Sequence, residues 1–521
     1  ASISPPRRRE EEGPSSKRQK LDHRGPRPSQ VESGTAPNGL KTEQTPAVPD
    51  AKTASRTQAP LDGVSNTRVP CPYGVVKRTW ASSHDRSNDV KIEEVLQPDR
   101  LRKAVLSSFQ WDHEWLFSKV DPRKTDLLFV VQAKTDAERD AITAEGRAVN
   151  PRIKLCFPPM RGQVNCMHSK LMLLFYDDYL RVVVPSANLT PYDWGDDGRM
   201  ENTVFMVDLP QRTTGESRAP EDMTFFGREL CFFLETMQMP DHLLSALLRY
   251  DFSGTNHLAF VHTAGGAHYG SSLRRTGFPG LARAVHHLGL ATERLELDIA
   301  SSSLGALSDD FLAALHAAAR GEQRAAQLTT LEYKTRRHTH ARQLRIHFPT
   351  HDTVVGSFGG EDAAGTICLQ GRWYAAAGFP RALMRDYRSS RPGLLSHNKL
   401  WLARGIGTAR GSTEDGAKDA NETAKGRPVA WAYVGSHNLS ESAWGRMVKD
   451  RGRAELKLNC RNWECGVLIP VLGADEEENL TSTLGEGAVP GMDVFRGKVD
   501  IPFEWPGEEY GTRKPWLMSG E

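Results

Sequence analysis

Several features that would assign the protein to a particular class are absent from the sequence. The seven cysteines show neither a CxxC motif nor a Cys/His metal spacing, a pattern typical of reduced thiols in the cytosol or nucleus. No apolar run approaches the roughly 18 residues of a membrane-spanning helix, and no signal peptide stands at the start. The net charge is only +2, so any anion-binding site must arise from local clustering. We therefore expect a soluble intracellular protein with no membrane partner.

Large apolar side chains are also scarce in the N-terminal stretch, which is rich in Pro, Ser, Thr, Gly, Arg and Gln. Such a segment cannot bury enough surface to offset its ordering entropy, so we predict a disordered tail over residues 1–90. Two basic clusters, Arg7–Arg9 and Lys17–Lys20, resemble a bipartite nuclear-import signal and indicate a nuclear protein. A solvated run of charges is the alternative.

The remainder alternates predicted strands with predicted helices, and several strands are apolar on both faces. A Gly/Ala/Ser stretch at 263–272 suggests a hinge between two halves. We predict an α/β fold of two similar α-β-α sandwich domains, with mixed sheets flanked by helices and related by pseudo-two-fold symmetry. The domains would cover residues 91–268 and 269–521, with a flexible insertion at about 404–428.

The strongest signal is a group of motifs that occurs twice in the same order. The first copy consists of His168-x-Lys170-Leu171, Ser186-x-Asn188-Leu189 and Asp193-Trp194-Gly195. The second copy consists of His397-x-Lys399-Leu400, Ser436-x-Asn438-Leu439 and Ala443-Trp444-Gly445. A single His-x-Lys pattern has almost no predictive value, but an ordered duplicate indicates two half-sites that face one another.

Alternate residues of a strand point to the same side, so each histidine shares a face with its lysine. Two lysines and two asparagine amides that converge on one spot would form a cage for a phosphodiester. One lysine about 4 Å from an oxyanion contributes roughly 4 kcal/mol at an effective dielectric near 20. Two lysines could replace the Mg²⁺ of other phosphoryl-transfer enzymes, so we predict a site with no metal and no cofactor.

Because the lysines would stabilise the negative charge, the histidines are available for covalent chemistry and proton transfer. One neutral imidazole can attack phosphorus, while the other donates a proton to the leaving oxygen and then activates water. Glu464 and Glu201 each open a strand after the second and first asparagine, respectively, and are candidates to orient the imidazoles. Ordinary ion pairing is the alternative for both glutamates.

Together these residues resemble the phospholipase D superfamily, whose members carry two HKD motifs. The usual aspartate five residues after each lysine would fall at Phe175 and Arg404, and neither is acidic. Its loss, together with Asn188 and Asn438, resembles the tyrosyl-DNA phosphodiesterase branch that acts on 3′ ends. The segments 105–116, 300–305 and 501–516 agree, and the likeness covers roughly residues 95–518.

The resemblance implies a role for each motif residue. His168 would be the nucleophile, and His397 the acid that releases tyrosine and then the base for hydrolysis. Lys170, Lys399, Asn188 and Asn438 would hold the phosphate, and Glu464 would occupy the family's carboxylate position. The family usually has a glutamine at the matching first-half position. Counting from Asn188 gives Arg199 there, whereas alignment of the following strand gives Glu201, which we prefer.

Hydroxyl groups supply candidate contacts to DNA. Ser301, Ser302 and Ser303 open a loop after a strand, where hydroxyl and N–H groups can bind phosphates. Capping of the helix that begins near residue 307 is the alternative. Ser440 could donate to DNA or stabilise its own turn, and the basic stretch 333–342 could border the DNA path. No aromatic residue immediately precedes His168 to stack on a base.

The predicted function is hydrolysis of the bond between a topoisomerase I tyrosine and a DNA 3′-phosphate, by a monomer. A superfamily nuclease or lipid phosphodiesterase is one alternative, disfavoured by the missing aspartates. A non-catalytic DNA-binding relative is the other, disfavoured because both His/Lys/Asn sets are intact.

Overall fold

The computed structural model describes residues 69–212, 219–327, 343–407, 426–450, 452–484 and 488–518. These residues belong to one compact unit. The two basic clusters of the predicted tail, the basic stretch 333–342 and most of the predicted insertion lie outside the described residues.

The first half is built on a mixed sheet with the strand order β2-β1-β10-β8-β7-β3-β4-β5. Its strands are β1 (Val75–Thr79), β2 (Asp89–Val90), β3 (Lys103–Ser107), β4 (Asp126–Val130), β5 (Lys154–Cys156), β7 (Leu171–Phe175), β8 (Tyr179–Pro185) and β10 (Thr203–Pro210). Its helices are α1 (Ile92–Leu96), α2 (His113–Lys119), α3 (Asp136–Val149), α4 (Phe225–Thr236) and α5 (Asp241–Leu247), with short 3₁₀ turns at Pro220–Asp222 and Ser253–Thr255.

The second half is built on a mixed sheet with the order β11-β21-β18-β17-β13-β14-β15. Its strands are β11 (Ala259–Thr263), β13 (Thr292–Ser301), β14 (Leu344–Phe348), β15 (Met384–Asp386), β17 (Lys399–Gly407), β18 (Arg427–Gly435) and β21 (Asn462–Pro470). Its helices are α6 (Gly270–Leu273), α7 (Gly277–His287), α8 (Asp309–Ala319), α10 (His351–Val355), α11 (Gly371–Ala375), α12 (Glu441–Trp444) and α13 (Ala474–Leu484). Its 3₁₀ turns are Ala325–Gln327, Gly360–Ala364, Arg381–Leu383 and Met492–Phe495.

Shorter strands lie outside these two sheets. A three-stranded sheet joins β12 (Gly266–His268), β20 (Leu456–Cys460) and β19 (Arg446–Lys449). Two parallel ribbons connect the halves: β6 (Cys166–Met167) pairs with β21, and β9 (Met200–Glu201) pairs with β16 (Leu395–Ser396). Each ribbon directly precedes one of the motif histidines.

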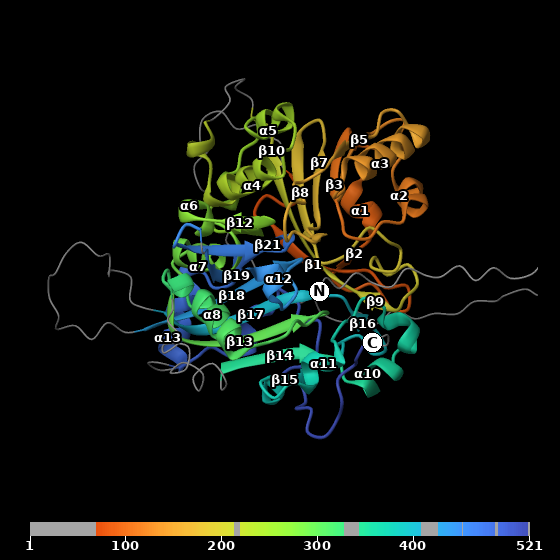
Figure 1. Cartoon of the computed structure of the whole chain (residues 1–521). Helices are drawn as coiled ribbons and strands as arrows, with labels where there is room; N and C mark the ends of the chain where they lie inside the picture. The colour runs from red at the N-terminus through yellow and green to blue at the C-terminus, as the bar shows by residue number, and fades with distance from the viewer. Residues whose placement is uncertain are drawn as a thin grey trace, which may run out of the picture. The chain divides into compact units, whose positions relative to one another are not determined.

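The two large sheets repeat one topology. Strands β10-β8-β7-β3-β4-β5 and β21-β18-β17-β13-β14-β15 follow the same order. In both series the first three pairings are antiparallel and the last two are parallel. Figure 1 shows the strands of each series side by side, with α7 and α8 against the second sheet. The predicted mixed α/β fold with two large mixed sheets is confirmed.

The apolar side chains form three layers that account for this arrangement. One layer, which includes Leu106 and Leu116, fills the space between the first sheet and helices α1 and α2. A second layer joins the inner faces of both sheets, where Val184 and Val434 belong to the same cluster. The third covers the second sheet with α7 and α8. Strands buried on both faces explain the continuous apolar runs in the sequence.

The ordered fold begins earlier than the predicted end of the tail at residue 90. Strand β1 pairs antiparallel with β10, with Val76 opposite Phe205. Only Val76 and Thr79 of this strand are buried, so its sequence carries little apolar signal. Strand β11 occupies the equivalent place in the second sheet, because it pairs antiparallel with β21. Strand β11 thus belongs to the second sheet, although it lies before the predicted boundary at 268/269. The division into two domains remains a prediction.

The predicted insertion also starts later than residue 404. Strand β17 continues to Gly407, and β18 begins at Arg427. Arg404 is buried and donates to Asp298 and Glu296. In the sequence, this charged residue inside the strand therefore resembles the start of a surface loop.

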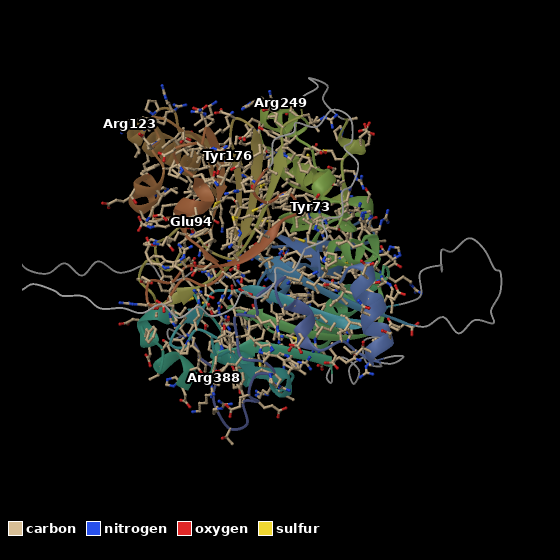
Figure 2. All side chains as sticks on the ribbon, turned by 180° about the vertical axis from the view of Figure 1, so that it is seen from behind. Tyr73, Glu94, Arg123, Tyr176, Arg249 and Arg388 are labelled. Carbon is tan, nitrogen blue, oxygen red and sulfur yellow. The ribbon has the colours of Figure 1, made fainter. Side chains whose placement is uncertain are left out.

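The C-terminal segment packs along the outer strands of the second sheet. The Asp386 amide of β15 donates to the Glu508 carbonyl over 2.8 Å. Arg388, which is labelled in Figure 2, donates to the Glu508 carboxylate. Within the described part of the chain, no helix is both long and apolar enough to cross a membrane.

Candidate active site

Each motif histidine is held in place by a strand of the opposite half. The His168 amide, directly after β6, donates to the Trp463 carbonyl of β21 over 3.0 Å. The His397 amide, directly after β16, donates to the Glu201 carbonyl of β9 over 3.1 Å. The backbone of both histidines is therefore fixed where the two halves meet.

The imidazole of His168 is hydrogen-bonded to a buried carboxylate. Its Nδ1 lies 2.8 Å from Glu464 Oε2, and Glu464 also accepts hydrogen bonds from Ser436 Oγ and Asn462 Nδ2. Burial raises the pKa of Glu464, but His168 and Ser436 outweigh it and hold the pKa near 2. Burial also lowers the pKa of His168. A neutral ring that donates from Nδ1 leaves the Nε2 lone pair available for attack.

The imidazole of His397 faces a carboxylate from the first half. Its Nδ1 lies 3.3 Å from Asp193 Oδ1, in a contact that is not well directed for a hydrogen bond. Asp193 is buried and accepts a 2.6 Å hydrogen bond from the backbone amide of Asn188. Burial, with the positive charge of Lys399, lowers the pKa of His397 to about 3, although Asp193 opposes this shift.

The structure also identifies the first-half equivalent of Glu464. Ser436 Oγ donates to Glu464 and accepts from the Cys465 amide, whereas Ser186 Oγ donates to Asn202 and accepts from the Thr203 amide. Asn202 therefore takes the place of Glu464. Its Nδ2 donates to the Asp193 carbonyl over 2.8 Å, so it supports Asp193 rather than contacting the ring.

This geometry corrects the preference for Glu201 over Arg199 at that position, because Asn202 occupies it. Glu201 is fully buried, but its carboxylate is bound by Arg391 and Ser389 instead of His397. The Arg199 carbonyl accepts the Leu395 amide, a backbone contact only. Asp193 belongs to the first motif copy, but the second copy has Ala443 at the equivalent position. Nothing in the sequence therefore indicated that this carboxylate contacts His397.

Both motif lysines are fully buried beside their histidines. Lys170 Nζ donates to the His168 carbonyl over 3.1 Å, and Lys399 Nζ to the His397 carbonyl over 2.5 Å. Burial lowers the pKa of both lysines, and mutual repulsion lowers that of Lys399 further, against the attraction of Asp193 and Glu464. The charge of Lys399 also acts on His168, and that of Lys170 on His397. The two half-sites thus share one electrostatic environment.

The asparagine side chains are held through their oxygen atoms. Asn188 Oδ1 accepts from the Gln110 amide over 3.3 Å. Asn438 Oδ1 accepts from the Ser303 amide and from the hydroxyls of Ser301 and Ser302. With these acceptors occupied, the amide NH₂ groups are the ones that can donate to a phosphate oxygen.

The candidate DNA-binding serines have local roles. Ser301 and Ser302 donate to Asn438, and helix α8 is capped by Ser308, whose Oγ accepts the Phe311 amide. None of the three predicted serines is therefore that helix's cap. Ser440 caps α12 by accepting the Ala443 amide. Their contacts to DNA remain a prediction.

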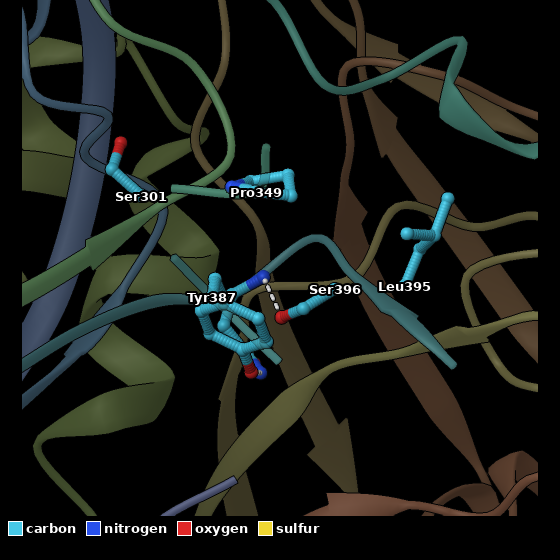
Figure 3. Close-up of a pocket in the computed structure, with 6 residues that line it drawn as sticks. Ser301, Pro349, Tyr387, Leu395 and Ser396 are labelled. Carbon is cyan, nitrogen blue, oxygen red and sulfur yellow. Dashed lines mark hydrogen bonds between the residues drawn. The ribbon is translucent and has the colours of Figure 1, made fainter. Parts of the chain in front are cut away.

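Two further features escaped the sequence reasoning. The Phe109 ring is half-buried, with its centroid 5.3 Å from that of His168; it supplies an aromatic group that the residues before His168 do not. A small pocket adjoins the residues that flank His397, and it is lined by Ser301, Pro349, Tyr387, Leu395, Ser396 and Asn398 (Figure 3).

No group of three or more His, Cys, Asp or Glu side chains within the described ranges is arranged to hold a metal ion. The charged groups that face the two imidazoles are instead Lys170, Lys399, Asp193 and Glu464.

Known proteins resemble this chain in sequence and in fold. Residues 75–511 match the protein family described as tyrosyl-DNA phosphodiesterase. Tyrosyl-DNA phosphodiesterase 1 of Arabidopsis thaliana is 23% identical over 424 residues, which cover 78% of this chain but only 62% of the plant protein. The crystal structure of yeast tyrosyl-DNA phosphodiesterase has a TM-score of 0.59 at 16% identity, over 86% of this chain and 100% of that one.

A second crystal structure of the yeast protein, a histidine variant, gives a TM-score of 0.60 at 18% identity over the same shares. At these identities the structures establish the fold alone, whereas the family match covers most of the sequence and both motif copies. The chain therefore belongs to the tyrosyl-DNA phosphodiesterase family.

Proposed function

We propose that the protein hydrolyses the phosphodiester bond between a tyrosine and a DNA 3′ end, without a metal and through a covalent phosphohistidine. The observation that carries this proposal is the pair of buried imidazoles from opposite halves, each next to a carboxylate on Nδ1 and a lysine of its own motif. Such a pair suits a two-step displacement at one phosphorus.

In the first step, His168 Nε2 attacks phosphorus and the bond from phosphorus to the tyrosine oxygen breaks. A proton from His397 passes to that oxygen, so tyrosine leaves as a neutral phenol. Glu464 stabilises the positive charge that develops on the His168 ring, because its carboxylate accepts the Nδ1 proton over 2.8 Å. Lys170, Lys399 and the two asparagine amides bind the non-bridging oxygens.

In the second step, a water molecule attacks phosphorus and the bond to His168 breaks. His397 is now neutral and takes the proton from the water. His168 returns to its neutral form, and the product is DNA with a 3′-phosphate. Both enzyme groups regain their starting protonation states, so the cycle is balanced.

The low pKa of His397 in the empty site is compatible with its role as an acid, because the charge of the bound substrate raises that pKa. The ring must be protonated in the first step, but burial and the lysines hold its pKa near 3. A phosphodiester anion between Lys170 and Lys399 offsets their charge, so binding raises the pKa of His397. Substrate binding thus favours the protonated form of His397 that the first step requires.

A covalent adduct with topoisomerase I is the proposed natural substrate. The nuclear location, the monomeric state and the acceptance of other 3′ blocking groups are parts of the same proposal. They draw on the family resemblance and on the basic clusters within residues 7–20.

A 3′-phosphotyrosyl oligonucleotide incubated with the protein in EDTA tests the proposal. We expect release of tyrosine and an oligonucleotide that ends in a 3′-phosphate. Tight binding without turnover would instead support the non-catalytic DNA-binding alternative, and activity only after addition of Mg²⁺ would contradict the metal-independent chemistry.

A further inference from the structure

A buried ion pair joins the two halves at the ribbon that directly precedes His397. Arg391 donates to Glu201 Oε2 through Nε over 3.0 Å and through Nη2 over 2.7 Å. Ser389 Oγ donates to the other carboxylate oxygen over 2.5 Å. Glu201 is fully buried and Arg391 is 6% exposed, so neither charge is shielded by solvent.

This cluster is connected to His397 through the backbone. Glu201 lies on β9, and its carbonyl accepts the His397 amide. Strand β9 pairs in parallel with β16, where Ser396 lies opposite Glu201; both β16 residues line the pocket in Figure 3. Arg391 also donates to the Thr79 carbonyl at the end of β1. The ion pair therefore fastens the segment that leads into His397 to two strands of the first half.

The equivalent ribbon in the other half contains no charge. Trp463 takes the place of Glu201, because its carbonyl accepts the His168 amide as the Glu201 carbonyl accepts that of His397. Trp463 is fully buried, and its Nε1 donates to the Pro159 carbonyl. A ribbon of this kind can thus be held without a buried ion pair, and burial of two charges in its place carries a desolvation cost.

The two imidazoles also differ in how firmly their side chains are held. His168 has a hydrogen bond from Nδ1 to Glu464, whereas His397 has only the looser 3.3 Å contact with Asp193. The orientation of His397 depends more heavily on its backbone, and hence on the β9·β16 ribbon.

We propose that Glu201 and Arg391 are positioning residues for His397, which hold its ring at the distance needed for proton transfer to the leaving group. This inference rests on the proposed function. Loss of the pair should therefore impair the steps that need His397 and spare the attack by His168.

The dependence on the leaving group provides the test. Tyrosine is a poor leaving group that needs protonation, whereas p-nitrophenol leaves readily as an anion. For Glu201→Gln we expect about a tenfold slower first step with a 3′-phosphotyrosyl oligonucleotide, a fraction of the roughly 10²–10⁴-fold contribution of a general acid. With a 3′-p-nitrophenyl phosphodiester the first step should change by less than about twofold, and the phosphohistidine should accumulate because the second step is slowed.

A double variant separates positioning from stability. Removal of one partner leaves a buried charge unpaired and lowers the melting temperature, whereas Glu201→Gln with Arg391→Met removes both charges. We expect the double variant to regain thermal stability but to keep the altered ratio between the two substrates. If the ratio returns to the wild-type value along with stability, the pair is only structural and the inference is overturned.

Glu229→Gln is the matched control. Glu229 is also buried and is bound by Arg275 and Arg283, but it lies on α4 and contacts His262 rather than a motif histidine. This variant should lose stability and leave the substrate ratio unchanged. A wild-type protein that fails to cleave either substrate would refute the proposed function, whereas a wild-type ratio in every Glu201 and Arg391 variant would refute this inference alone.

Discussion

Glu464 and Asp193 give two chemically identical imidazoles different surroundings. Glu464 accepts a short hydrogen bond from His168, which increases the basicity of the opposite nitrogen and suits a nucleophile. Asp193 contacts His397 at 3.3 Å and is itself bound by the Asn188 amide. A carboxylate at this distance stabilises a protonated ring electrostatically and suits an acid that later becomes a base.

Substitution of the two carboxylates should therefore affect different steps. We expect Glu464→Gln to slow formation of the phosphohistidine by about 10²-fold or more, because the nucleophile loses its anionic partner. Asp193→Asn should slow its hydrolysis, so the adduct accumulates. Single-turnover kinetics with a 3′-phosphotyrosyl oligonucleotide separates the two rates; accumulation in Glu464→Gln and none in Asp193→Asn would reverse the assignment.

The low pKa of His397 predicts a pH dependence of binding. Its pKa is about 3 in the empty site, and a bound phosphodiester raises it. The protonated form therefore binds more tightly, and affinity should increase as the pH falls from 8 to 6, by at most about tenfold per pH unit for one proton.

The His168→Ala variant binds without cleaving, so its dissociation constant for the intact 3′-phosphotyrosyl oligonucleotide measures this effect. His168→Ala combined with His397→Gln is the control and should lose the pH dependence. Binding of the single variant that is independent of pH, or that weakens as the pH falls, would contradict the proposed proton uptake.

The sequence predicted some of these residues more readily than others. Both His-x-Lys pairs and both asparagines stand out because they recur in order, and Glu464 follows from its place at the start of a strand. The roles of Asp193 and Asn202 could not be predicted. Asp193 contacts His397 of the other half, and Asn202 donates to the Asp193 carbonyl in a different segment of its own half. Glu201 was noticed because it opens the strand after the first asparagine, but the Arg391 that binds it is 190 residues away.

At the scale of secondary-structure elements, the glycine of the first Trp-Gly motif shows why a short motif carries structural information. Gly195 has a φ of +78°, and a Cβ atom there would lie 1.7 Å from the Trp80 carbonyl oxygen. Trp194 is fully buried, and its Nε1 donates to the Asn188 carbonyl. The turn therefore needs glycine both for its backbone conformation and for the close approach of the neighbouring chain.

We expect Gly195→Ala to destabilise the fold by roughly 2 kcal/mol more than Gly162→Ala does. Gly162 also has a positive φ, of +65°, but no atom lies within 4 Å of its would-be Cβ. It therefore reports the conformational cost alone, about 1 kcal/mol. Denaturant unfolding monitored by fluorescence measures both; equal losses of stability would show that the contact with Trp80 is readily relieved.

Elements with long apolar runs were predictable, and elements bound through polar contacts were not. The central strands β7, β8, β17 and β18 are buried along almost their whole length. Strand β1 escaped notice because only two of its five residues are buried. The ribbons β6 and β9 have two residues each, too few for any periodicity, although they place both motif histidines.

At the scale of the whole folded unit, the duplicated topology accounts for the site. Six strands of each half share one order and one set of directions, so equivalent histidines approach from the two halves. Each half also reaches across to hold the histidine of the other, through Trp463 and Glu201. Neither imidazole has its full set of contacts within its own half, which makes the folded pair of halves the functional unit.

The central claim is that these two imidazoles act in turn on one phosphorus. The most direct test is to incubate the His397→Asn variant with a 3′-phosphotyrosyl oligonucleotide in EDTA, digest the trapped DNA adduct and locate the modified residue by mass spectrometry. The account predicts an acid-labile phosphoramidate on His168. An adduct on any other residue, or an adduct that also forms in the variant without His168, would contradict it.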